Sequence, residues 1–332
     1  VMLCLVLVLS TLHLIGPVET DASEKIRVIF GVTSSKSGMY PWQAAHGTII
    51  NQNVPDLMVT TVECPHAAAE VLEHIRKGEM HFGIGGTRMM YRAYHGIDDY
   101  QGRAIPHLRC IMTLAVIPFT IFVSQESGIQ ALTELEGKKF GTSFPASLTG
   151  KKIHKICDAL GIRPNYFEAT MGATIEAYKA GKIVGFIKPG APDSAILTCA
   201  AVKPIRLLPI TKAQFEICKS KYPGYFSKLS VIPAGTYPGQ KTDISAVTFL
   251  PAWVGTSKLS PDIVYKMLKV WYENRKTLAA LYAAANKEEG ELGFPKLTIE
   301  TASIPLHAGA YKFYREIGLN IPDRLIPPEV KK

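Results

Sequence analysis

The run Met80-His81-Phe82-Gly83-Ile84-Gly85-Gly86 follows a helical pattern and Gly78, and it predicts a short buried strand that ends in glycine. The same order returns later, where a helical pattern and Gly181 precede Ile183-Val184-Gly185-Phe186-Ile187-Lys188-Pro189-Gly190. In open α/β sheets, ligands bind beyond the carboxyl ends of strands, where glycine lets a ligand approach the backbone. The repeated unit therefore predicts two similar lobes that face each other. Two unrelated strand–helix turns are the alternative.

The segments around the first unit alternate between strand and helix. Ile26–Phe30 is a strand-like run, and Pro41 suits the first turn of a helix that ends near Asn51. A second strand, Met58–Val62, precedes a helix near residues 66–77. This alternation predicts an α/β layered fold.

Two strands are expected to cross between the lobes. Thr120–Val123 leads out, ahead of a helix-like segment Ile129–Leu135, and Ala246–Leu250 leads back. The predicted lobes are residues 23–122 with 247–332, and residues 123–246. A long helix follows the return strand, with Ser260 as its cap and Pro261 in its first position. Its apolar stripe, which we interpret as core packing, consists of Val264, Met267, Leu268, Trp271, Leu278 and Leu281.

The first residues have the pattern of an export signal. Val1–Val18 is apolar apart from a few polar residues, and a small-residue cleavage site lies near Ala22. No Lys or Arg precedes the apolar run, and an uncleaved anchor helix is the alternative. We expect residues 1–22 to be removed and the protein to be periplasmic.

The composition is that of a folded protein with a basic surface. The 332 residues are 47% hydrophobic and 20% charged, and the net charge is +9. Removal of residues 1–22 would take away Glu19 and Asp21, which gives 9 + 2 = +11. The basic residues form no cluster interleaved with aromatics, which argues against a nucleic-acid partner. The charge is compatible with gathering anions.

Motifs for catalysis or cofactor binding are absent from the sequence. Six cysteines form no CxxC pair, and neither G-x-S-x-G nor H-E-x-x-H occurs, so no metal or cofactor is indicated. The segment Gly141–Lys152 suggests a phosphate loop, but Pro145 and Lys152 do not fit one. Catalytic groups can assemble from distant segments, so an enzyme remains an alternative, with Cys64 and His66 as its candidate pair.

Two polar loops each precede a predicted helix. Thr33–Tyr40 opens the helix near Pro41, and Thr142–Thr149 opens a helix over Lys151–Leu160. Free N–H groups at helix starts bind anions, and serine and threonine hydroxyls add donors. The alternative is simple capping by the same hydroxyls. Basic side chains beside the loops are expected to add a charge-assisted bond, above all Lys188; the others are Lys36, Arg88 and Lys151.

Five segments carry a resemblance to a known family. They are GVTSSKSGMYP at 31–41, LEGKKFGTSFPASLTGKKIHKICDALGI at 135–162, GFIKPGAPDSAI at 185–196, IPAGTYPGQKTDISAV at 232–247 and IPLHAGAYKFYREIG at 304–318. In these segments the sequence resembles the TAXI family, the TRAP-associated extracytoplasmic immunogenic solute-binding proteins.

The resemblance implies an α/β, periplasmic-binding-protein-like fold of two lobes joined by crossing hinge strands. It implies a protein without catalytic activity that delivers a small organic acid to TRAP membrane permease subunits. Matched position by position, the family's ligand loops fall on Thr33–Tyr40, Thr142–Thr149 and Pro189–Pro192. The candidate ligand-binding residues are Thr33, Ser34, Ser37, Met39, Tyr40, Thr87, Ser143, Ser147, Leu148, Thr149, Lys188, Pro189, Gly190 and Ala191.

This sequence departs from the family pattern in the loops themselves. Phe144, Pro145 and Leu148 are bulky where the family has small residues. We therefore expect a more apolar pocket, suited to a larger or aromatic carboxylate rather than glutamate. The remaining alternatives are a pyrimidine-synthase-like enzyme on the same scaffold and the effector-sensing part of a regulator, against which the export segment argues.

Overall fold

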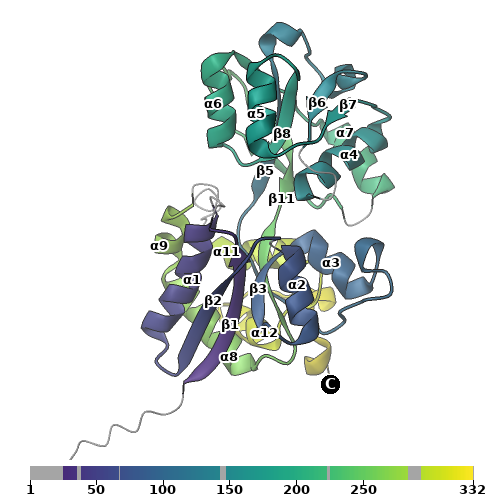
Figure 1. Ribbon diagram of the computed structural model, residues 1–332. Coiled ribbons are helices and arrows are strands. Elements are labelled where there is room, and N and C mark those ends of the chain that lie inside the picture. Colours follow the sequence, from purple (N-terminus) through teal and green to yellow (C-terminus); the bar gives the residue numbers. More distant parts are fainter. Residues whose placement is uncertain are drawn as a thin grey trace, which may run out of the picture.

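The chain folds into two α/β lobes joined by strands, as Figure 1 shows. The computed structural model describes residues 25–35, 39–66, 68–142, 147–222, 225–282 and 293–331. The predicted signal at residues 1–22 and the candidates Ser37 and Ser143 lie outside the described residues. The predicted arrangement of two α/β lobes is confirmed.

Lobe I contains the sheet β2-β1-β3-β12-β4. Its strands are β1 (Ile26–Thr33), β2 (Leu57–Cys64), β3 (Phe82–Gly86), β4 (Leu108–Thr113) and β12 (Pro251–Thr256). The helices around it are α1 (Tyr40–Asn53), α2 (Ala68–Lys77), α3 (Thr87–His95), α8 (Pro261–Glu273), α9 (Arg275–Ala280), α11 (Gly293–Thr301) and α12 (Ala308–Glu316). Phe30 stacks on Phe82 with ring centroids 4.4 Å apart, and the edge of Trp253 closes this part of the core.

Lobe II contains the sheet β10-β11-β5-β8-β6-β7, and β9 also pairs with β5. Its strands are β5 (Ile117–Ser124), β6 (Lys139–Gly141), β7 (Asn165–Phe167), β8 (Gly185–Pro189), β9 (Ile205–Leu207), β10 (Leu229–Ile232) and β11 (Ile244–Phe249). The helices are α4 (Leu148–Leu160), α5 (Met171–Lys179), α6 (Ser194–Val202) and α7 (Lys212–Lys221).

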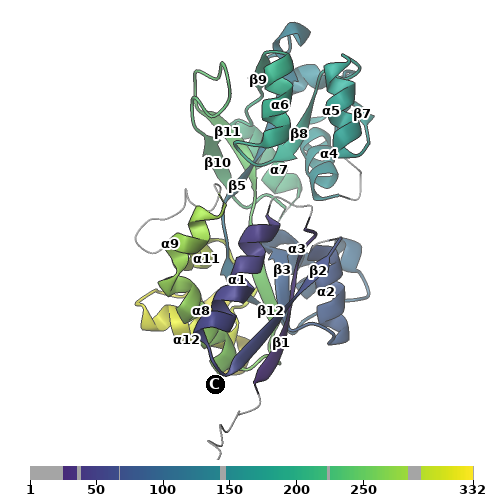
Figure 2. The same cartoon turned by 60° about the vertical axis from the view of Figure 1, so that its left-hand side comes forward.

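Strands β5 and β11 carry the chain between the lobes. They pair antiparallel where Thr248 lies opposite Pro118 and Phe249 opposite Ile117. Strand β5 follows β4 and runs from lobe I into lobe II, and β11 runs back toward lobe I, where Leu250 alone separates it from β12 (Figure 2). The predicted crossing strands Thr120–Val123 and Ala246–Leu250 therefore coincide with β5 and β11, except that β11 ends at Phe249.

The repeated unit of the sequence is present in both lobes. Helix α2, Gly78 and β3 form the first copy, and β3 runs parallel to β1. Helix α5, Gly181 and β8 form the second, and β8 runs parallel to β6. Gly78 has a φ of 79° and Gly181 a φ of 68°, so each turn uses a backbone conformation that favours glycine. The carboxyl ends of parallel strands therefore form one edge in each lobe.

Three predicted helices differ from the structure: the helix after Ser260, the segment Ile129–Leu135 and the helix over Lys151–Leu160. The helix after Ser260 is two helices, because the side chain of Asn274 donates to Val270 O at 2.9 Å and competes with the backbone pattern at the break. The stripe is buried as expected except at Leu281, which is 49% exposed. Only a single 3₁₀ turn, Leu132–Leu135, forms within Ile129–Leu135.

Helix α4 begins at Leu148 and not near Lys151. The Gly150 N–H donates to Ser147 Oγ at 2.9 Å, so Ser147 caps the helix and the two residues after it belong to the first turn. Leu148 and Thr149 are thus helical residues rather than loop residues.

Buried free thiols are the observed state of the cysteines among the described residues. Cys64, Cys110, Cys157, Cys199 and Cys218 are all buried and unpaired. No two of these five cysteines form a disulfide.

Candidate functional site

The candidate site lies where the carboxyl ends of parallel strands in the two lobes face each other. In lobe I, β1 leads into the start of α1, and β3 leads directly into α3. In lobe II, β6 precedes α4, and β8 precedes α6. Figure 1 shows α4 of lobe II next to α3 of lobe I. Helix starts, whose first N–H groups have no partner within the helix, are therefore present on both lobes.

The first predicted loop is held in place by a buried glutamine. Thr33 donates to Gln43 Oε1 through its backbone N–H at 2.8 Å and through its hydroxyl at 3.1 Å. Gln43 is fully buried in α1, and its Nε2 has no hydrogen-bond partner among the described residues. The Thr33 hydroxyl is therefore engaged with α1 and holds the end of β1 against this helix. Ser34, Met39 and Tyr40 are partly buried, and the latter two pack on the core of lobe I.

The third predicted loop follows β8. Lys188 and Pro189 end the strand, and the Gly190 carbonyl accepts from Thr120 Oγ1 at 2.7 Å and from Tyr237 Oη at 3.3 Å. The Asp193 N–H donates to the same Tyr237 hydroxyl at 3.1 Å. Ala191 is buried. The loop is thus anchored from two sides by hydroxyl groups.

Lys188, the basic residue most favoured from the sequence, forms an ion pair with Asp193. Asp193 also caps α6, because its Oδ1 accepts from Ala195 N at 3.0 Å and from Ile196 N at 3.2 Å. The Lys188 charge is therefore balanced within lobe II. A ligand at this position would have to compete with Asp193.

The other candidates occupy the starts of α3 and α4. Thr87 is the first residue of α3 and is buried, and its N–H donates to Leu250 O at 3.1 Å. Ser147, Leu148 and Thr149 are partly buried at the start of α4. Thr87 therefore lies at the start of α3 in lobe I, and the other three residues lie at the start of α4 in lobe II.

A lysine that the sequence analysis did not propose as a ligand-binding residue is buried near the start of α4. Lys152 lies in α4 and is 3% exposed. Its Nζ donates to Tyr225 O at 3.1 Å and lies within 5.6 Å of the ring centroids of Phe119, Tyr225 and Phe226. Burial and the nearby Arg88 charge lower the pKa of Lys152 to about 7.

Arg88 of lobe I contacts Tyr225, one of the aromatic residues beside Lys152. It is the second residue of α3, and its guanidinium lies over the ring of Tyr225. Asp98 Oδ2 is 3.6 Å from it. Burial lowers the pKa of Arg88 to about 9, so it keeps its charge at neutral pH. Two basic side chains, one from each lobe, thus converge on Tyr225.

An ion pair connects the same helices. Lys151 Nζ of α4 lies 2.6 Å from Asp99 Oδ2 of lobe I, and Arg92 of α3 lies 2.8 Å from the same oxygen. The lobes therefore contact each other through polar groups at the edge of the candidate site.

One signal for Lys152 was present in the sequence. It stands in register with Ile156, one turn later on the buried face of α4, and a lysine in an apolar stripe is rarely buried without a partner. Tyr225 follows no motif, and only the fold brings it to Arg88.

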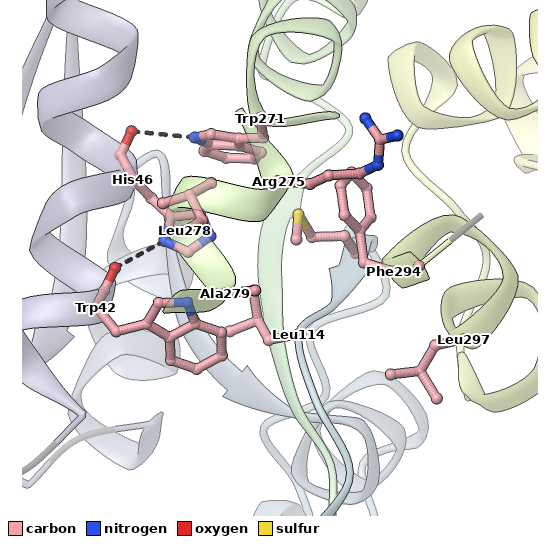
Figure 3. A pocket seen from close by; sticks show the side chains of 11 residues that line it. Trp42, His46, Leu114, Trp271, Arg275, Leu278, Ala279, Phe294 and Leu297 are labelled. Atoms are coloured by element: carbon pink, nitrogen blue, oxygen red, sulfur yellow. Dashed lines mark hydrogen bonds between the residues drawn. The ribbon is translucent and has the colours of Figure 1, made fainter. Parts of the chain in front are cut away.

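Figure 3 shows a pocket inside lobe I, lined by Trp42, His46, Met112, Leu114, Trp271, Arg275, Leu278, Ala279, Gly293, Phe294 and Leu297. The His46 carbonyl accepts from Trp271 Nε1 at 3.0 Å, and the His46 ring donates to Trp42 O at 2.9 Å. Burial lowers the pKa of His46 to about 4, so the ring is neutral. The His46 Nδ1 and the Trp271 indole are thus engaged with protein, and no candidate ligand-binding residue lines this pocket.

Within the described ranges, no set of three or more His, Cys, Asp or Glu side chains is arranged to hold a metal ion. No helix in the described part of the chain has the length and apolar character of a membrane span.

The sequence pattern of the NMT1-like family matches residues 31–318. A putative sulfonate ABC transporter protein, the periplasmic sulfonate-binding protein SsuA from Methylobacillus flagellatus KT, has a similar structure, with a TM-score of 0.51, 14% identity and 92% coverage of each chain. A TctC solute binding protein from Polaromonas is similar with a TM-score of 0.50 and 14% identity over 83% of this chain and 91% of that one. At this identity the likeness shows the fold, which is that of two-lobed periplasmic binding proteins.

Proposed function

Because this chain belongs to the NMT1-like family, we propose that it is a periplasmic solute-binding protein that captures a small organic anion between its lobes. The observation that carries the proposal is the convergence of Arg88 from lobe I and Lys152 from lobe II on Tyr225. Closure of two lobes on a solute is an established form of hinge motion.

The chemistry of the facing surfaces favours an anionic solute. The positive dipole end of α4 lies in this region, where Ser147 accepts from the Gly150 N–H, and basic side chains extend from α3 and α4. A carboxylate held between the lobes would satisfy donors on both sides. Such a solute would therefore bind more tightly to the closed form than to the open form.

The finer assignment is a TAXI-type protein that delivers its solute to TRAP membrane permease subunits. It rests on the five segments that resemble the TAXI family, which are residues 31–41, 135–162, 185–196, 232–247 and 304–318. Export rests on the apolar pattern of residues 1–18. The bulky residues of the second loop favour a larger or aromatic carboxylate as the solute.

The enzyme alternative loses its only candidate nucleophile. Burial raises the pKa of the Cys64 thiol to about 11, and the thiol is directed at Val62 O at 4.0 Å. The thiolate is the nucleophilic form of cysteine, and at neutral pH this side chain stays protonated. Binding is therefore the function that the described site favours.

A thermal-shift screen on residues 23–332 tests the proposal. The panel contains glutamate, 2-oxoglutarate, benzoate and phenylacetate, with benzamide and phenylacetamide as neutral controls. A solute at 100 times its Kd stabilises the folded state by about 2.7 kcal/mol, which gives a clear rise in Tm. We expect at least one acid to raise Tm and the amides to have no effect. A flat response to every acid would reject anion binding.

A further inference from the structure

The ammonium group of Lys152 has fewer partners than a buried charge requires. An ammonium has three N–H donors, and the structure gives Lys152 one acceptor, the Tyr225 carbonyl. Three aromatic rings surround it and supply cation–π attraction. Rings do not neutralise the charge, and burying an uncompensated charge is costly.

No described carboxylate faces this lysine. The groups that act on Lys152 are Arg88 from α3, which is another cation, and Cys218 from α7, whose thiol is protonated at neutral pH because burial raises its pKa to about 11. The undescribed residues nearest in sequence, 143–146 and 223–224, contain no Asp or Glu. The protein itself thus provides no counter-ion among the residues that pack here.

The second cation comes from the opposite lobe. Arg88 and Lys152 share the ring of Tyr225, so they approach each other only when the lobes are together. Asp98 is 3.6 Å from Arg88, and Asp99 also acts on it, but both carboxylates are about half exposed, so they screen the arginine only in part. An anion between the two cations would relieve their repulsion and bind both lobes at once.

We propose that Lys152 and Arg88 together bind the charged group of the solute, and that Lys152 takes up a proton when this anion binds. The inference rests on the proposed function and names the two side chains that recognise the anion. The solute class is a carboxylate whose apolar part contacts the rings beside Lys152.

Proton uptake follows from the environment of the lysine. With its pKa lowered to about 7, Lys152 is partly neutral at neutral pH in the absence of solute. A bound anion favours the charged form of a neighbouring amine. Binding at pH 7.5 to 8 therefore shifts Lys152 to its protonated state, with the proton taken from the buffer.

The test compares Lys152→Met with Lys155→Met, a matched change on the same helix. Lys155 is partly buried, and its Nζ lies 4.0 Å from the centroid of the Tyr222 ring and 5.2 Å from that of the Tyr225 ring, so the control removes a cation beside the same ring but not the buried ammonium. Each variant of residues 23–332 is titrated calorimetrically at pH 7.5 with benzoate, phenylacetate and 2-oxoglutarate, in phosphate and in Tris. We expect at least a tenfold loss of affinity in Lys152→Met and none in Lys155→Met. Wild type and Lys155→Met should take up protons on binding, and Lys152→Met should not.

Two further measurements separate recognition from folding. Without solute, Lys152→Met should melt at or above the wild-type temperature, because an uncompensated buried charge has been removed. Arg88→Gln, which changes the other lobe, should lose affinity for the same acid. A Lys152→Met protein that melts well below wild type would show a structural lysine and overturn the inference.

The remaining outcomes distinguish the two proposals. If wild type and Lys152→Met bind an acid equally, the inference fails while anion capture stands. If an acid and its amide bind equally, recognition by charge is rejected. If wild type binds none of the acids, the proposed function fails as well.

Discussion

Asp99 Oδ2 of lobe I lies 2.6 Å from Lys151 Nζ of lobe II, and this ion pair joins the lobes. Asp99 is also 2.8 Å from Arg92 of its own lobe, which holds its carboxylate in place. Burial acts to raise the pKa of Asp99, but Lys151 and Arg92 together outweigh it and lower this pKa. The pair is therefore formed at neutral pH and is partly exposed, so salt should weaken it.

Asp99→Asn should shift the solute-free protein toward an open form. We expect a larger radius of gyration in small-angle scattering, and 0.5 M NaCl should produce the same expansion in wild type but little more in the variant. Asp56→Asn is the matched control, because Asp56 pairs with Lys266 at 2.7 Å within lobe I. Equal radii for Asp99→Asn and wild type at low salt would show that the pair does not hold the lobes.

The buried lysine predicts a pH dependence of stability. Lys152 has its pKa lowered from 10.5 to about 7 in the folded state, so the unfolded chain binds more protons between these values. The contribution of this group to stability thus rises with pH across the window, by at most ~1.4 kcal/mol per unit. Below pH 7 both states are protonated and the destabilisation is complete.

Lys152→Met removes this contribution. Its gain in stability over wild type should be largest at pH 6 and should shrink toward pH 9.5, as measured by urea unfolding. A stability difference that does not change with pH would contradict the assigned state of Lys152.

Ser147→Ala tests the cap of α4. The loss of the Gly150 N–H partner should cost about 1 kcal/mol of unfolding free energy, together with a loss of affinity for the acid. Thr211→Ala removes a comparable cap from α7, where Thr211 Oγ1 accepts from Gln214 N at 3.2 Å, and should lower stability alone. Ser147→Asp keeps a capping group but adds negative charge, so it should retain stability and lose the acid. Unchanged affinity in Ser147→Asp would remove this helix start from the site.

Tyr237→Phe tests the anchoring of the third loop. Its hydroxyl accepts from Asp193 N and contacts Gly190 O, so its removal should cost about 1–2 kcal/mol and weaken binding of the acid. Tyr178→Phe makes the same chemical change at a buried hydroxyl without a hydrogen-bond partner among the described residues, and it should be nearly neutral. Equal unfolding free energies for the two variants would show that the loop does not depend on Tyr237.

The sequence was most informative where local chemistry controls the backbone. Gly78 and Gly181 marked the ends of equivalent helices because their turns need positive φ. Pro41 and Pro261 marked helix starts for a similar reason. The glycine signals, placed twice along the chain, predicted two similar lobes, with two unrelated strand–helix turns as the alternative.

The sequence was least informative where distant side chains compete for one partner. Lys188 was favoured as the ligand cation, but Asp193 forms an ion pair with it. Thr33 carries a hydroxyl at the predicted site, but Gln43 accepts its hydrogen bond. Lys152 and Tyr225 are 73 residues apart, and nothing in their local sequences relates one to the other.

Small-angle scattering of Asp99→Asn with and without a bound acid tests the central claim most directly. In this variant the ion pair between the lobes is removed, so closure should depend on the solute. We predict that the acid that raises Tm most reduces the radius of gyration to the wild-type value, and that its amide leaves the variant open. An acid that binds with calorimetrically measured affinity but leaves the radius unchanged would contradict capture between the lobes.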